Sequence, residues 1–278
     1  SKKIVFPEIS SILDNKLSTH FYFENLNLPI PKLISYNLNN SFFFNKKTEN
    51  LSSNADLHHY FTKVFNQKSL TQLFLKPLRG NAGKGIILLK KNTLQEQIQT
   101  NRACLLSNSY MHQEVIIQHP EINKIHSKSI NTLRIETYID SNNKVHILSL
   151  IMRFGVDDNI VDNVSNGGFL VPVNLNNGEL QGNGYQSLIS GGRVYSKHPT
   201  SKVLLDGIKI PFFKEACEIT KQAALYLPNK VIGWDIAITQ NGPVIIEGNK
   251  NPGMIMTDIA FGGYLKHPLI KELLNITS

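Results

Sequence analysis

Three side chains with oxygen donors, Asp235, Glu247 and Asn249, are the strongest candidates for chemistry in this sequence. They lie in two apolar stretches joined by a tight Asn-Gly turn, which predicts a β-hairpin. In that hairpin Asp235 lies beside Glu247, and Asn249 shares the face of Glu247. Oxygen donors without histidine or cysteine suit Mg²⁺ or Mn²⁺, and a cation relieves the repulsion between facing carboxylates. A metal site is favoured over a pair of solvated carboxylates.

A second candidate is the glycine-rich loop at residues 80–85, which follows an apolar strand ending at Lys76. Glycines let backbone amides approach an anion closely, and lysine adds a positive charge for phosphate oxygens. The loop is not a Walker A loop, because Lys84 is followed by Gly85 instead of the Ser or Thr that binds magnesium. It indicates a phosphate site; the alternative is a hairpin turn that needs glycine only for its backbone.

Two arginines, Arg134 and Arg153, lie inside apolar strand segments. A guanidinium does not lose its proton in proteins, so this placement is costly unless an anion lies nearby. The anion is either a bound phosphate or a protein carboxylate, for which Glu136 and Asp140 are the candidates.

Signatures of other enzyme classes are absent from the sequence. It has no G-x-S-x-G elbow and no H-E-x-x-H motif, and Gly182 and Gly184 lie in a turn instead of at the start of a Rossmann helix. His112, His119 and His126 are seven residues apart with a strand break between them. This spacing indicates surface or local groups instead of a metal triad.

The elements expected to position these residues are antiparallel strands in the middle of the chain and helices at both ends. Helices are predicted over residues 10–23, 57–65, 93–99, 211–227 and 268–276. Strands are predicted over residues 73–76, 86–89, 114–118, 132–139, 145–152, 169–173, 231–239 and 243–247. This pattern predicts an α+β fold instead of a regular βαβ alternation.

Composition narrows the class of protein. The chain has 278 residues, enough for two compact domains at roughly 100–200 residues per domain. With 41% apolar and 18% charged residues it can form a real core, and it has no apolar stretch of about 18 residues that would span a bilayer. Cys104 and Cys217 lack zinc-site spacing, which favours plain thiols in a reducing compartment, the cytosol.

The charge balance is basic, with 29 Lys and Arg against 21 Asp and Glu, a net +8 and a pI near 9.3. That favours an anionic partner such as a nucleotide, a sugar phosphate, nucleic acid or an acidic membrane surface. The basic residues are scattered and form no dense run, so nucleic acid is not the expected partner.

The order and spacing of these motifs resemble the ATP-grasp superfamily: Phe74-Leu75-Lys76-Pro77, the glycine loop, an extended hinge, and Asp235 followed by Glu-x-Asn-Pro-Gly. Within it, four stretches resemble the sugar-transfer-associated ATP-grasp subgroup. They are residues 113–120 (QEVIIQHP), 129–134 (SINTLR), 162–168 (DNVSNGG) and 233–235 (GWD). The resemblance spans residues 18–253.

The resemblance implies an α+β fold in which two lobes with antiparallel sheets grip Mg·ATP. The implied parts are a small N-terminal α/β segment at residues 1–70, a small lobe with the glycine loop at 71–117, and a large lobe at 118–278 that carries the metal site and an acceptor loop. The chain departs from the family pattern at Gly248, where a bulkier residue is usual, and at Lys250.

The resemblance also implies a role for each candidate residue. Lys76 holds α/β-phosphate oxygens, the backbone at 114–117 pairs with adenine, and Glu121 binds ribose. The implied ATP contacts are Lys76, Arg79, Gly80, Asn81, Gly83, Lys84, Gly85, Glu114, Val115, Ile117 and Glu121. The implied metal ligands are Asp235, Glu247 and Asn249, the groups that neutralise the reacting phosphates are Arg134 and Arg153, and the acceptor contacts are Asp162, Asn163, Asn166 and Gly167.

The implied activity is ligation, in which ATP activates a carboxylate as an acyl phosphate and an amine or a thiol displaces phosphate. The subgroup associates such chemistry with cell-surface polysaccharide assembly, with small-molecule or sugar-linked substrates, in the cytoplasm or transiently at the membrane surface. One alternative is a kinase on the same scaffold, with Asp157, Asp158 or Asp162 as the base. Another is a non-catalytic anion-binding module, which leaves the cluster around Asp235 unexplained.

Overall fold

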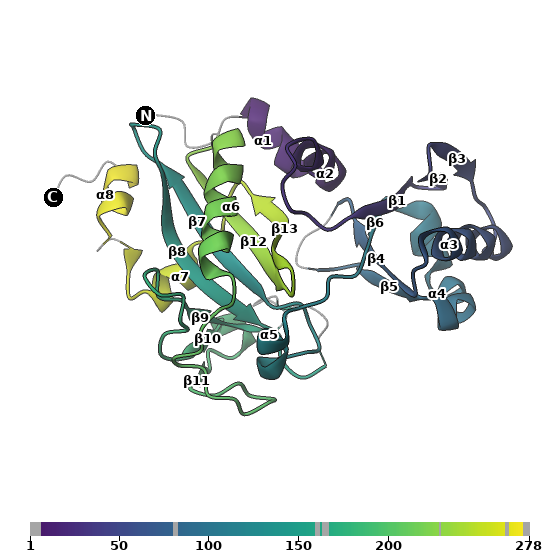
Figure 1. The fold of residues 1–278 in the computed structure, drawn as a ribbon. Helices are drawn as coiled ribbons and strands as arrows, with labels where there is room; N and C mark the ends of the chain where they lie inside the picture. Colours follow the sequence, from purple (N-terminus) through teal and green to yellow (C-terminus); the bar gives the residue numbers. More distant parts are fainter. Residues whose placement is uncertain are drawn as a thin grey trace. The chain divides into compact units, whose positions relative to one another are not determined.

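The computed structural model describes residues 7–79, 83–158, 162, 167–227, 229–264 and 267–274 (Figure 1). The helices are α1 (Pro7–Asp14), α2 (Lys16–Asn25), α3 (Asn54–Lys68), α4 (Leu94–Ser107), α5 (Pro120–Ile125), α6 (Phe213–Tyr226), α7 (Ile255–Ala260) and α8 (Pro268–Leu274), with short 3₁₀ turns η1 (Lys91–Thr93) and η3 (Leu188–Ser190). The strands are β1 (Leu33–Leu38), β2 (Ser41–Phe44), β3 (Lys47–Asn50), β4 (Gln72–Pro77), β5 (Ile87–Lys90), β6 (Tyr110–Gln113), β7 (Thr132–Ile139), β8 (Val145–Phe154), β9 (Phe169–Pro172), β10 (Gly184–Gln186), β11 (Val194–Tyr195), β12 (Val231–Thr239) and β13 (Gly242–Asn249).

The chain divides into two compact units, each built on one antiparallel sheet. One unit comprises residues 15–22 and 31–115, and the other comprises residues 1–14, 23–30 and 116–278. The α+β fold with antiparallel sheets is confirmed. The boundary expected at residue 70 falls inside the first of these units, because β1–β3 join the same sheet as β4–β6.

The smaller unit is a six-stranded sheet in the order β3-β2-β1-β6-β4-β5, with α3 and α4 packed together. Helix α3 begins at a capping box in which Ser53 and Asp56 exchange side-chain and backbone hydrogen bonds. Its apolar residues Leu57, Phe61 and Val64 follow at helical spacing and are fully buried. The core of this unit therefore forms between the helices and the sheet. Leu73 and Leu75 of β4 are part of this core, which holds the strand that carries Lys76.

Histidine 112 is buried in this sheet, so the expectation of a surface or local group is wrong for it. Its Nδ1 lies 2.7 Å from Ser35 Oγ and its Nε2 lies 3.0 Å from Asn37 Oδ1, both on β1. Burial lowers its pKa to about 3, so the ring is neutral at physiological pH.

This burial makes the stability of the smaller unit depend on pH. In the unfolded chain His112 takes up a proton below its ordinary pKa near 6.5, while the folded ring stays neutral down to about 3. The free energy of unfolding should therefore fall by about 1 kcal/mol per pH unit as the pH drops below about 6.5. Urea unfolding at about pH 7 and about pH 5 would measure this slope for wild type, His112→Gln and, as a control, the exposed His58→Gln. A slope unchanged by His112→Gln would contradict the prediction.

The larger unit is a seven-stranded sheet in the order β11-β10-β9-β8-β7-β12-β13. The two predicted hairpins, β7–β8 and β12–β13, are confirmed. Helix α6 contacts β7, β8, β12 and β13 (Figure 1). Trp234, which is fully buried, donates from Nε1 to Thr137 Oγ1 at 2.9 Å and lies with its ring 6.0 Å from that of Phe23.

Two predicted elements differ from the structure. The helix predicted over residues 10–23 is divided at Asn15, because Asn15 Oδ1 accepts the backbone N–H groups of Leu17 and Ser18 and so caps α2. The strand predicted over residues 114–118 is wrong at 114–117, which are neither helix nor strand. The strand of this region is β6, which ends at Gln113.

Neither cysteine forms a disulfide: Cys104 is exposed and Cys217 is buried. No helix in the described ranges combines the length and apolar character needed to cross a membrane.

Candidate functional site

The β12–β13 hairpin places the three predicted metal ligands on one side of the larger sheet. Asp235 pairs directly with Glu247, and Gly233 pairs with Asn249. The register shifts immediately after Asp235, so that Ile236 pairs with Ile245. Because direct antiparallel partners share a face, the Asp235 and Glu247 carboxylates emerge side by side.

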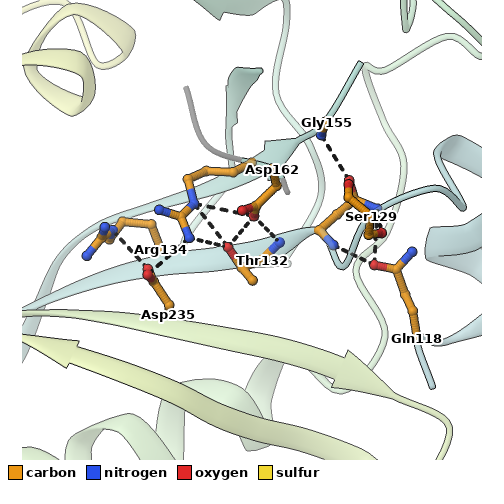
Figure 2. Close-up of polar contacts among 9 residues, drawn as sticks. Gln118, Ser129, Thr132, Arg134, Gly155, Asp162 and Asp235 are labelled. Carbon is orange, nitrogen blue, oxygen red and sulfur yellow. Dashed lines mark hydrogen bonds and ion pairs between the residues drawn. The ribbon is translucent and has the colours of Figure 1, made fainter. Parts of the chain in front are cut away.

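Asp235 forms ion pairs with both candidate arginines (Figure 2). Arg134, its direct partner on β7, places Nε 3.0 Å from Oδ1, and Arg153 on β8 places Nη2 3.1 Å from Oδ2. All three side chains are largely buried, at 10–19% exposure. At this burial the attraction between the charges is much stronger than in water.

Arg153 also forms an ion pair with Asp162, the first of the predicted acceptor contacts. Asp162 Oδ2 accepts the backbone N–H of Thr132 at 2.8 Å and its hydroxyl at 2.5 Å, and lies 3.5 Å from Arg153 Nε. Arg153 in turn donates to Thr132 Oγ1 from Nε at 3.0 Å and Nη2 at 2.6 Å. Burial raises the pKa of Asp162, while Arg153 and Thr132 act in the opposite direction. Asp162 therefore ties the loop to the sheet.

Hydrogen bonds from buried amide groups hold the start of β7, which begins at Thr132. The backbone N–H of Asn131 donates to Gln118 Oε1 at 2.6 Å, and Asn131 Oδ1 accepts the N–H of Gly155 at 3.2 Å (Figure 2). Ser129 Oγ donates to the same oxygen at 3.2 Å. These contacts cannot be predicted from the sequence, because a buried amide in a loop has no local signal.

The carboxylates considered as partners of the arginines bind other groups. Glu136 accepts the hydroxyls of Ser149, Thr257 and Tyr264, and Asp140 accepts from His146 at 2.8 Å. The alternative that the arginines pair with Glu136 or Asp140 is therefore wrong, because both form ion pairs with Asp235.

The donor set of this face fits a divalent cation bound together with an anion. Two guanidinium groups face three carboxylates, those of Asp162, Asp235 and Glu247, which leaves the group negative. Among the described residues, Arg134 Nη1 is a buried polar atom without a hydrogen bond, and Asp235 Oδ1 also lacks one but forms the ion pair with Arg134 Nε at 3.0 Å. Arg134 Nη1 is therefore a buried donor that suits a bound anion. Within these same ranges no cluster of three His, Cys, Asp or Glu residues could hold a metal, and the assignment of Asp235, Glu247 and Asn249 as metal ligands stays a prediction.

The predicted phosphate-binding residues belong to the smaller unit. Lys76 is the penultimate residue of β4, and Arg79 and Lys84 are exposed. Gly83 and Gly85 have φ of +74° and +75°, a left-handed conformation that glycine adopts without strain. Gly80 and Asn81 lie outside the described residues.

The predicted adenine hinge follows β6 directly. Glu114 donates its N–H to Lys32 O at 3.0 Å and forms an ion pair with Lys32 at 3.5 Å. Val115 ends the smaller unit, and Ile117, in the larger unit, is 70% exposed.

The remaining predicted contacts lie in separate places in the larger unit. Glu121 lies in the first turn of α5, where it pairs with Lys124 at 2.7 Å. Gly167 O accepts Gln186 Nε2 at 2.8 Å. Asn163 and Asn166 lie outside the described residues.

Both departures from the expected family pattern have structural reasons. A Cβ at Gly248 would lie 3.2 Å from Leu13 Cδ2 and 3.2 Å from the Trp234 ring, so these side chains fill the space of a bulkier residue. Lys250 Nζ lies 2.6 Å from Asp14 Oδ2 on α1, so its ammonium group pairs with a carboxylate of the protein.

Comparison with known proteins agrees with this fold. The family model for sugar-transfer associated ATP-grasp proteins matches residues 2–273. The solved structure of D-alanyl-alanine synthetase A from Vibrio cholerae is similar, with a TM-score of 0.54 and 13% identity over 98% of this chain and 66% of that chain. N5-carboxyaminoimidazole ribonucleotide synthetase from Thermotoga maritima has a TM-score of 0.52 and 10% identity over 98% and 51%. The chain thus spans about half to two thirds of these structures. No curated protein matches.

Proposed function

Because the chain belongs to the sugar-transfer associated ATP-grasp family, we propose that it is an ATP-dependent ligase that joins a carboxylate to an amine. The observation that carries this proposal is the face shared by Asp235, Glu247, Arg134 and Arg153. The proposal assigns these groups to binding and neutralising phosphate and metal, and both Asp235 oxygens are already paired with the arginines. The substrate carboxylate therefore acts as the nucleophile.

In the proposed reaction a substrate carboxylate oxygen attacks the γ-phosphorus of ATP, and the bond from that phosphorus to the bridging oxygen of ADP breaks. The amine then attacks the acyl carbon, loses a proton to solvent and displaces inorganic phosphate. Asp235, Glu247 and Asn249 would hold the cation, which when bound neutralises and orients phosphate oxygens. Arg134 and Arg153 stabilise the negative charge that develops on the transferred group.

The proposal assigns nucleotide contacts to Lys76, the glycine loop, the predicted hinge and α5. Lys76 and Lys84 are assigned to the phosphates, the backbone of 114–117 to adenine and Glu121 to ribose. This assignment is supported by the left-handed glycines beside Lys84 and by the position of Lys76 at the end of β4. The proposed setting is cell-surface polysaccharide assembly in the cytoplasm, with a small or sugar-linked carboxylate and amine.

An oxygen-isotope experiment tests this proposal. The protein is incubated with Mg²⁺, ATP, uronic acids labelled with ¹⁸O in the carboxylate, and amino acids as amines. We expect phosphate release that requires both acceptors, with one ¹⁸O transferred to the released phosphate. Phosphate retained on the product would instead establish a kinase. Absence of ATP binding by calorimetry would favour the anion-binding module.

A further inference from the structure

Two bulky apolar side chains project from the larger unit without covering anything. Leu188 is 83% exposed and Ile189 is 98% exposed, both in the η3 turn between β10 and β11. Val194, on β11, is 58% exposed. These strands extend the sheet beyond β9, away from β12 and β13, where the candidate site lies (Figure 1). The catalytic proposal gives these residues no role.

The turn that presents them, residues 186–193, is well ordered by hydrogen bonds. Ser187 Oγ accepts the N–H of Ser190 at 3.2 Å, and Ser187 O accepts the N–H of Gly192 at 2.9 Å. Gln186 N–H donates to Arg193 O at 2.9 Å, which closes the base. Gly191 and Gly192 have φ of +115° and +62°, so the reversal depends on glycine. The backbone thus holds Leu188 and Ile189 outward in a fixed conformation.

The charged residues along the chain around this tip are positive. From Gln181 to Leu205 the sequence contains no Asp or Glu, but it contains Arg193, Lys197 and Lys202. Arg193, at the base of the turn, and Lys197 are exposed. An apolar tip above exposed cations complements an anionic bilayer, in which apolar side chains enter the headgroup boundary while Arg and Lys meet phosphates.

We propose that the tip formed by Leu188 and Ile189, with Arg193 at its base, docks the protein onto anionic phospholipid membranes. The contact is peripheral and reversible, because two side chains bury little apolar area and the cations contribute only near a negatively charged surface. This inference does not depend on the reaction catalysed.

Vesicle flotation of the full chain tests the proposal. Vesicles of phosphatidylcholine with about 30% phosphatidylglycerol are compared with phosphatidylcholine alone, at low and high salt. We expect binding only to the anionic vesicles, weakened by salt. Leu188→Ser with Ile189→Ser should lower the partition coefficient at least about tenfold, since transfer of each side chain from water is worth about tenfold or more. Arg193→Gln should lower it several-fold.

Matched controls separate this role from folding and from other contacts. Leu225→Ser removes another exposed apolar side chain, on a helix that carries Glu215 and Glu218, and should leave vesicle binding unchanged. Thermal unfolding should be unchanged in the tip variant, because these side chains are exposed. Equal vesicle binding by wild type and the tip variant, or no binding by wild type, would overturn the proposal. So would a dimer in sedimentation that the tip substitutions dissociate, because the tip would then bind a second copy.

Discussion

Glu247→Gln is expected to lower ATP-dependent turnover by about a hundredfold to a thousandfold and to abolish stabilisation by Mg·ATP. The substitution keeps the shape of the side chain opposite Asp235 but removes one of the two proposed carboxylate ligands. In wild type, Mg·ATP at about 100 times its Kd should raise the free energy of unfolding by about 2.7 kcal/mol. For a chain of this length that corresponds to a rise in Tm of about 5–10 °C. Thermal unfolding with Mg²⁺ alone, ATP with EDTA, and Mg·ATP would measure the shift.

Glu218→Gln is the matched control for this prediction, since Glu218 is an exposed glutamate on α6 that pairs with Lys221 at 2.8 Å. It should behave as wild type in both assays. If Glu247→Gln keeps the metal-dependent shift, the metal assignment fails even if the chain still binds ATP.

Arg153→Met is expected to destabilise the larger unit by about 3–5 kcal/mol, lowering its Tm by about 6–20 °C. Methionine fills a similar volume but leaves Asp162 and Asp235 buried without this guanidinium. Because burial raises the pKa of Asp162, the folded protein takes up its proton more readily than the unfolded chain. The deficit should therefore shrink as the pH falls toward about 4 and grow as the pH rises. Thermal unfolding across this pH range would measure it.

The double variant Arg153→Met with Asp162→Asn tests the cause of that loss. Removing the Asp162 charge should recover a large part of the stability, since the buried anion no longer lacks a cation. A double variant as unstable as the sum of the single variants would show that the loss comes from packing instead of charge.

The sequence predicts the strands better than the connections between them. Alternation and turn residues such as Asn241-Gly242 predict both hairpins of the larger sheet, because the turn fixes the register. Residues 114–117 also have an apolar strand-like composition, yet the chain leaves the sheet there and exposes Ile117. Local composition cannot distinguish a strand from a crossing between units.

In the candidate site, too, contacts within one hairpin are predictable from the sequence and contacts between distant strands are not. The position of Asp235 opposite Glu247 is predictable, because both lie on one hairpin. The pairing of Arg134 and Arg153 with Asp235 is not, since it depends on β7 and β12 becoming neighbours despite their separation in sequence. Near neighbours such as Glu136 therefore seemed better partners, although hydroxyl groups occupy that carboxylate.

The N-terminal segment gives the larger unit an unusual order of assembly. Its Leu13 and Phe23 lie against Gly248 and Trp234, although the unit otherwise consists of residues 116–278. During synthesis Leu13 and Phe23 emerge long before Gly248 and Trp234, and residues 31–115 of the smaller unit are made in between. Because these contacts join residues far apart in sequence, we expect them to form slowly and late in folding. A fragment starting at residue 116 would expose the Trp234 side of its sheet where the N-terminal segment normally packs.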